Sequence, residues 1–247
     1  MTAEAAGRAG DSRDQPQPIL SHLEELRWRI VRSALAIALG SVIALIFADW
    51  LRKILEAPYR NSCLDCELQV FGATEQFSVL MRIALFGGLI LASPVVLYQI
   101  WAFISPALST RERKWVIPII GACAGLFVLG IVTGYWALPR GLGFLLNIFE
   151  DVRSDLRMVE YFSFTIRFVL AFGLSFLYPV FLFAIAAAGM ISSQQLAKGR
   201  RWAVLIIVVV AAAITPTGDA LTLAMLSVPL YVFYEITYWL VRGVLRK

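Results

Sequence analysis

The stretch SHLEELRWRIVR at residues 21–32 stands directly before the first long apolar run of the chain, residues 34–48. It places two acidic and three basic side chains at the start of an expected membrane-spanning helix. Charged groups concentrated at a membrane edge either orient the helix in the bilayer or form a recognition surface. Which of these roles applies decides what the protein does.

The composition is that of a membrane protein. The 247 residues are 60% hydrophobic and only 16% charged, whereas a soluble domain carries about 25% charged residues. The first 18 residues are polar and contain no apolar segment of a secretory signal peptide, so residues 1–20 are predicted to be a disordered cytoplasmic tail. The basic residues follow the expected topology, so the high pI gives no reason to predict nucleic-acid binding.

Apolar runs predict an all-α integral membrane protein with six transmembrane helices. Crossing the hydrocarbon takes about 20 helical residues, and four runs exceed that: 28–50, 77–104, 116–138 and 161–191. Helices five and six, at 202–214 and 220–241, are expected to be short and to form a tight hairpin. Residues 105–115, 139–160 and 192–201 are expected to be connections. One transmembrane domain therefore occupies 21–241, followed by a cytoplasmic tail at 242–247.

The basic residues predict the orientation. With both termini in the cytoplasm, 14 basic and 6 acidic residues lie inside, against 8 basic and 10 acidic residues outside. Cytoplasmic loops of membrane proteins carry the excess of Lys and Arg. The sequence therefore predicts that both termini are cytoplasmic, which agrees with an even number of spans.

Neither catalysis nor small-solute transport has support among the side chains. His22 is the only histidine, and no metal cluster, nucleophile–base pair or glycine-rich phosphate loop is evident. We therefore expect no enzyme, no cofactor and no metal. A secondary transporter of a small solute is the alternative, but it needs a polar path at mid-membrane, and the uncharged centres of helices two to four argue against one.

Three acids on the predicted cytoplasmic side, Glu24, Glu25 and Glu112, have basic neighbours. They are either ordinary partners in interfacial salt bridges, each worth little, or an anionic spot that takes an arginine-rich ligand by bidentate pairing. Ser21 followed by Glu24 also matches a helix capping box. The charges alone leave both interpretations open.

Cys63 and Cys66 form a CxxC pair in the first outer loop. On the oxidising side of a membrane such a pair either closes a small local disulfide or stays as free thiols. Cys123 is expected to be a small packing residue of the third helix.

Several blocks of the sequence resemble the TatC family, the receptor and core subunit of the twin-arginine protein translocase. SHLEELR at 21–27 is similar to the amino-terminal signature of that family, and the resemblance continues through Ala57-Pro58, through SPVVLYQIWAFISPAL at 93–108 and through RERK at 111–114. It then includes AFGLSF at 171–176 and ITPT at 214–217 with Asp219. The blocks occur in order and with six-span spacing.

The resemblance implies a cofactor-free receptor in the cytoplasmic (inner) membrane. Such a receptor binds twin-arginine signal peptides of folded proteins at the cytoplasmic face and works with the single-span partners TatA and TatB and with further copies of itself, and the proton-motive force drives transport. Its signal-peptide site would use Glu25 and Glu112, two carboxylates suited to two guanidinium groups. Leu23, Arg27, Pro58 and Phe103 match further functional positions of the family, with Arg27 as an orienting partner, and Asp219 and Pro58 serve structure or assembly.

One position departs from the family pattern. Many TatC proteins carry a glutamate in the fourth helix in a Phe-Glu-x-Pro context, whereas this chain reads Phe-Leu-Tyr-Pro at 176–179. Leu177 therefore stands where that acid would be, and no role that rests on the acid carries over.

Overall fold

The structure is a computed structural model that describes residues 19–62, 67–104, 116–146, 156–187, 189, 191–214 and 220–245. These residues are almost entirely helical. The helices are α1 (Ile19–Ile46), α2 (Ala48–Ser62), α3 (Ala73–Ile104), α4 (Val116–Leu146), α5 (Met158–Ser175), α6 (Tyr178–Ala187), α7 (Ser193–Ile214) and α8 (Ala220–Leu240), with a π-helical turn at Val241–Leu245. The all-α prediction is confirmed for this part of the chain.

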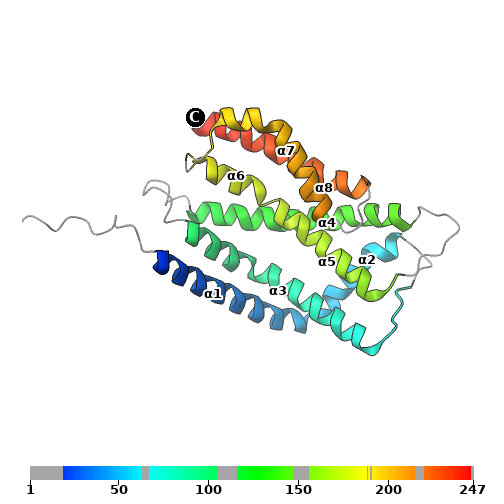
Figure 1. Cartoon of the computed structure of the whole chain (residues 1–247). Helices are drawn as coiled ribbons and strands as arrows, with labels where there is room; N and C mark the ends of the chain where they lie inside the picture. Colours follow the sequence, from blue (N-terminus) through cyan, green and yellow to red (C-terminus); the bar gives the residue numbers. More distant parts are fainter. Residues whose placement is uncertain are drawn as a thin grey trace, which may run out of the picture.

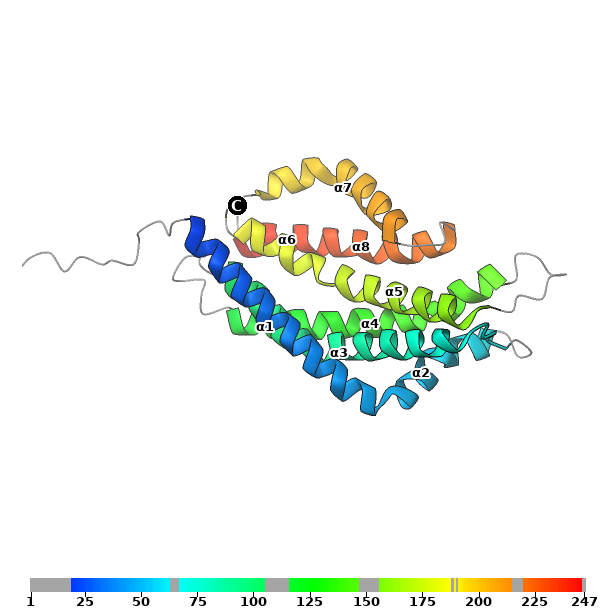
Figure 2. The ribbon, with the colours of Figure 1, turned by 60° about the horizontal axis from the view of Figure 1, so that its bottom comes forward.

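The long helices run roughly side by side, and both ends of the described chain lie at the same end of the bundle (Figure 1). We call this end, where α1 begins and α8 finishes, the terminal end. The opposite end, where α2 lies and where α3 and α5 begin, is the α2 end (Figures 1 and 2). The largest buried cluster joins side chains of every helix from α2 to α8, so α1 is held mainly by its contact with α3.

The contact between α1 and α3 depends on two glycines. A Cβ atom at Gly40 would lie only 2.7 Å from the carbonyl oxygen of Gly88, and a Cβ atom at Gly88 would lie 2.5 Å from the backbone nitrogen of Ser41. Small residues let two helix backbones approach closely in a membrane, where packing rather than the hydrophobic effect drives association. This contact sets the position of the charged start of α1 relative to the last turn of α3.

Five helical segments are long and apolar enough to cross a membrane: Leu23–Ile46, Ala73–Phe103, Ile119–Gly143, Met158–Ala186 and Thr222–Gly243. The fourth includes both α5 and α6. α7 is not among them, because Lys198, Arg200 and Arg201 lie in its first half. Five spans are therefore supported by length and composition, and the sixth stays a prediction.

Three predicted boundaries were wrong. α4 continues through Pro139 to Leu146, eight residues beyond the expected end at 138. The expected fourth span is two helices, interrupted at Phe176 and Leu177, because Pro179 has no N–H to continue the backbone ladder. The expected loop at 192–201 is the first part of α7, so helix five is longer than the 13 residues predicted.

The start of α7 has a local cause that the sequence carries. The backbone N–H of Gln195 donates to Oγ of Ser192 at 3.2 Å, and the backbone N–H of Ser192 donates to Oε1 of Gln195 at 2.9 Å. These reciprocal bonds form a capping box. The capping box expected at Ser21 is wrong, because α1 begins at Ile19 and Ser21 lies within the helix.

Candidate functional site

Glu25 lies in the second turn of α1, at the terminal end, with its side chain 30% exposed. Its Oε1 accepts hydrogen bonds from Nε of Arg29, at 3.0 Å, and from Nη2 of the same guanidinium. The two residues are one helical turn apart, a spacing that favours ion pairs. Glu25 is therefore already bound to an arginine of its own helix.

Arg29 also contacts α3. Its Nη1 donates to Oε1 of Gln99 at 3.4 Å, and the Gln99 residue is 8% exposed. The Arg29 side chain is 18% exposed. One guanidinium therefore joins the carboxylate of α1 to an amide of α3, at the point where the two helices meet.

A groove of about 400 Å³ lies next to this ion pair, between α1 and α3. We call it the α1–α3 groove. Apart from Arg29, Gln99 and Ser33, its lining is apolar: Leu26, Ile30, Ala34, Ile37, Val96, Ile100 and Phe103. The site thus combines a carboxylate, Glu25, paired with the lining residue Arg29, and an apolar surface between the two helices.

Two of the predicted site residues, Glu25 and Phe103, lie near one another through Arg29. Glu25 pairs with Arg29, and Phe103 lines the same groove as Arg29. Leu23 and Arg27 lie two residues before and after Glu25, on the other side of α1, and both are exposed, Leu23 at 55%. Glu112, the expected second carboxylate, lies outside the described residues, as do Asp219, Cys63 and Cys66. The predictions made for those four residues are not tested.

Pro58 lies at the α2 end, buried within α2 and far along the bundle from Glu25. Proline has no N–H, so it cannot bond the carbonyl of Ile54 four residues earlier. The hydroxyl of Tyr135, on α4, donates to that carbonyl at 2.9 Å, and the hydroxyl of Tyr161, on α5, donates to the neighbouring carbonyl of Leu55 at 2.5 Å. These two bonds join α2 to α4 and α5 beside Pro58.

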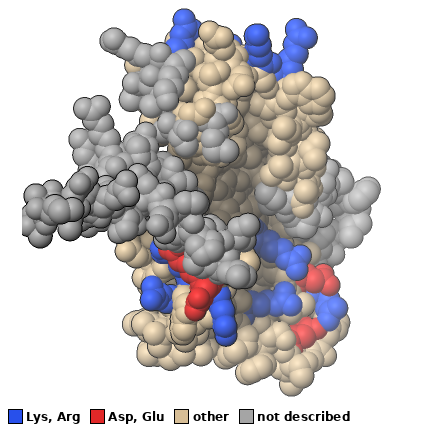
Figure 3. Space-filling view, turned by 60° about the vertical axis from the view of Figure 1, so that its left-hand side comes forward, with Lys and Arg blue, Asp and Glu red and all other residues tan. Residues whose placement is uncertain are grey.

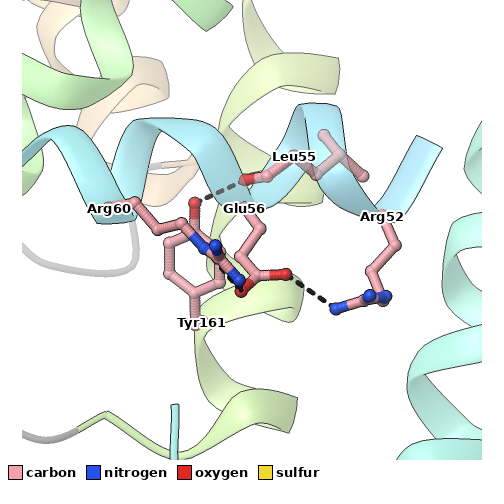
Figure 4. Close-up of polar contacts among 5 residues, drawn as sticks. All are labelled: Arg52, Leu55, Glu56, Arg60 and Tyr161. Atoms are coloured by element: carbon pink, nitrogen blue, oxygen red, sulfur yellow. Dashed lines mark hydrogen bonds and ion pairs between the residues drawn. The ribbon is translucent and has the colours of Figure 1, made fainter. Parts of the chain in front are cut away.

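Charged residues also pair with one another within α2. Glu56 accepts from Arg52 at 2.8 Å and from Arg60 at 2.7 Å, one turn away on either side (Figure 4). The Glu56 side chain is only 12% exposed, so the two arginines satisfy a largely buried carboxylate. The four-residue spacing of these residues is visible in the sequence, but the pairs were not predicted.

Leu177 is buried, at 5% exposure, in a cluster with Trp101, Cys123 and Phe127. The Nε1–H of Trp101 points at Sγ of Cys123 at 3.2 Å. The position that holds an acid in many TatC proteins is thus part of an apolar core here, and Cys123 is a buried packing residue, as predicted.

The terminal end carries a second set of charges on α7 and α8. Arg200 donates to Glu235 at 2.8 Å, and its guanidinium lies over the ring of Tyr238. In Figure 3, Lys and Arg gather at the height of α7 and α8, while both signs of charge occur at the height of α1 and α3, with a hollowed uncharged surface between them. Within the described ranges, no three His, Cys, Asp or Glu side chains are grouped so as to hold a metal ion.

Comparisons with known proteins agree with this arrangement. The family described as "Sec-independent protein translocase protein (TatC)" matches residues 21–229. TatC from Carboxydothermus hydrogenoformans is 35% identical, over 95% of this chain and 96% of its own, and TatC from Aquifex aeolicus is 38% identical, over 93% and 97%. A crystal structure of the twin-arginine translocase receptor TatC matches with a TM-score of 0.79 at 38% identity, over 90% of this chain and 98% of its own.

The family match over residues 21–229 and the five long apolar helices place the chain in the class of membrane-embedded protein-translocase components. The chain belongs to the TatC family. Its role is therefore transport rather than catalysis.

Proposed function

We propose that this protein is the receptor subunit of a twin-arginine translocase and that it binds the signal peptides of folded proteins at the terminal end. The observation that carries the proposal is the position of Glu25 beside the α1–α3 groove. A signal peptide of this kind presents two arginines and then an apolar segment. The site offers a carboxylate and then an apolar lining, in the same order.

The chemistry at Glu25 supports an arginine ligand. The carboxylate accepts two hydrogen bonds from a guanidinium in the structure, that of Arg29, so its surroundings accommodate the ligand group. Charge-assisted bonds of this type are stronger than neutral ones and select the planar guanidinium over an ammonium. Glu112 supplies the second carboxylate in this proposal, and Arg27 orients the site.

The apolar neighbours complete the proposed site. Phe103 contributes an aromatic side chain to the α1–α3 groove, where an apolar peptide segment would be buried. Leu23 is an exposed apolar side chain on the same helix as Glu25, and in the proposal it contacts the residues that follow the two arginines.

The proposal places the terminal end in the cytoplasm of the cell that makes the protein, with both termini inside, six spans and an inner-membrane location. The excess of basic residues on that side supports this orientation. TatA- and TatB-like single-span subunits and further copies of the chain would complete the translocase, with the proton-motive force driving transport. Pro58 and Asp219 would serve structure and assembly, and Cys63 and Cys66 would face the oxidising side, as a disulfide or as thiols.

Replacing Glu25 by Gln tests the site. We expect Glu25→Gln to weaken binding of a labelled synthetic twin-arginine signal peptide by about 10- to 100-fold, because a charge-assisted hydrogen bond contributes roughly 1.5–3 kcal/mol. Binding is measured by fluorescence anisotropy with the full chain in detergent. Glu24→Gln is the matched control, since it removes the same charge from the adjacent, exposed position, and it should change the affinity less than threefold.

Equal affinity of wild type and Glu25→Gln would show that Glu25 is not part of the site. Equal losses in Glu24→Gln and Glu25→Gln would show that only the general negative charge of this region matters.

A further inference from the structure

Arg29 occupies one oxygen, Oε1, of the carboxylate that the signal peptide would use. Its Nε and Nη2 both donate to Oε1 of Glu25, and this guanidinium is the same chemical group as the proposed ligand. A peptide arginine can form its own bonds to that oxygen only after Arg29 has moved away. Arg29 therefore competes with a peptide arginine for Glu25, in addition to stabilising α1 through an ion pair.

Gln99 gives Arg29 a second acceptor. Its Oε1 lies 3.4 Å from Nη1 of Arg29, on the opposite wall of the α1–α3 groove, and α1 and α3 lie next to one another in both ribbon views (Figures 1 and 2). A guanidinium displaced from Glu25 would otherwise be left as a partly buried charge without an acceptor, which is costly. The bond to Gln99, which is already present, lowers that cost.

We propose that Arg29 is an internal competitor of the signal peptide, bound to both Glu25 and Gln99 in the empty receptor and held by Gln99 alone when a peptide arginine takes its place on Glu25. This inference rests on the proposed function, since it concerns the same carboxylate. It adds that the affinity of the receptor is set below its maximum by a residue of the receptor itself, which favours release of the signal peptide after delivery.

Competition by Arg29 predicts a specific change in the measured Kd of the ligands of Glu25. If only the fraction of receptor with Arg29 displaced can bind, the apparent Kd of every ligand of Glu25 rises by the same factor. Removing Arg29 should therefore tighten binding of an Arg-Arg peptide and of its Lys-Lys version equally, and leave the ratio of the two affinities unchanged. A residue that contacted the peptide directly would change that ratio.

The experiment uses the full-length protein in detergent with two labelled synthetic signal peptides, one with Arg-Arg and one with Lys-Lys. We expect Arg29→Gln to tighten binding of both about two- to fivefold, the range for opening a partly exposed ion pair.

Gln99→Leu should weaken binding, because the displaced Arg29 then loses its acceptor, and it should have no effect in the Arg29→Gln background. The opposite signs of these two effects are not explained by a general loss of folding.

Arg32→Gln is the matched control for charge. Arg32 is exposed on α1, about one turn beyond Arg29, so its removal lowers the positive charge near the site without touching the Glu25–Arg29 pair. Any gain in Arg32→Gln should vanish at 0.5 M salt, where charges farther apart than about 4 Å are screened, while part of the gain in Arg29→Gln should persist.

The inference is overturned if Arg29→Gln weakens binding, which would make Arg29 a positioning residue for Glu25, or if it changes the Arg-Arg to Lys-Lys ratio. It is also overturned if Arg29→Gln and Arg32→Gln behave alike at both salt concentrations. These results leave the proposed function intact as long as Glu25→Gln weakens binding. Unchanged binding in Glu25→Gln is the separate result that would refute the proposed function.

Discussion

At the scale of single residues, Pro58 and Tyr135 explain how a proline is accommodated inside α2. The missing N–H of Pro58 leaves the carbonyl of Ile54 without its helical partner, and the Tyr135 hydroxyl donates to that carbonyl at 2.9 Å. A buried carbonyl with no donor costs about 1–3 kcal/mol. The hydroxyl of Tyr135 therefore stabilises α2 against α4.

Replacing Tyr135 by Phe should destabilise the protein by about 1–2 kcal/mol, because it leaves the Ile54 carbonyl unpaired. The same change should cost much less in a Pro58→Ala background, where residue 58 regains an N–H for that carbonyl. Both are measured as thermal unfolding midpoints in detergent. Tyr98→Phe is the control, since that side chain is 51% exposed. Equal costs of Tyr135→Phe in the two backgrounds would contradict this account.

Only some of the residues of the proposed site could be predicted from the sequence. Charges and the family resemblance identified Glu25, and the four-residue spacing from Glu25 to Arg29 was visible in SHLEELRWRIVR. Gln99 could not be found in this way, because it lies 70 residues from Arg29 and meets it only through the packing of α1 on α3. Tertiary pairs of this kind leave no local pattern.

At the scale of helices, the contact between α1 and α3 decides where the proposed site lies. α1 contributes Glu25 and one wall of the α1–α3 groove, and α3 contributes Gln99, Phe103 and the other wall. The backbones approach one another at Gly40 and Gly88, where no Cβ atom fits. Any widening of this contact should alter the groove as well as the stability of the fold.

Replacing Gly88 by Ala should therefore force α1 away from α3 and cost about 1–3 kcal/mol, the range for overpacking a close contact. We expect a lower unfolding midpoint and weaker binding of the twin-arginine peptide. Gly125→Ala, in α4, is the matched control, because a Cβ atom there meets nothing within 4 Å, and it should leave both quantities unchanged. If the two substitutions behave alike, the close approach of α1 and α3 is not what holds the groove.

The start of α7 and the end of α4 differ from the boundaries predicted from the sequence, each for a local physical reason. The capping box Ser192–Gln195 was present in the sequence, but the basic residues after it favoured a loop, so the first part of α7 was missed. α4 continues through Pro139, where Arg140 lies over the ring of Trp136 and donates to its carbonyl at 3.1 Å. Local capping and side-chain packing overrode the polarity on which the boundaries were predicted.

At the scale of the whole molecule, the two ends of the bundle differ in their polar contacts. The α2 end is held by internal pairs, such as those of Glu56 and the bonds from Tyr135 and Tyr161. The terminal end carries Glu25 with the α1–α3 groove, and α7 and α8 with Arg200 and Glu235. The class of fold and its long helices followed from the apolar runs, whereas this division of the two ends required the tertiary structure.

Photocrosslinking of a twin-arginine signal peptide to the full-length protein in membranes tests most directly whether Glu25 and the α1–α3 groove form the binding site. A photoreactive residue replaces Phe103, in the α1–α3 groove, or Trp136, which is 63% exposed and lies towards the α2 end. We expect a crosslink from position 103 that disappears with a Lys-Lys peptide and in Glu25→Gln, and none from position 136. Equal crosslinking from both positions, or a crosslink from 103 that persists in Glu25→Gln, would contradict this expectation.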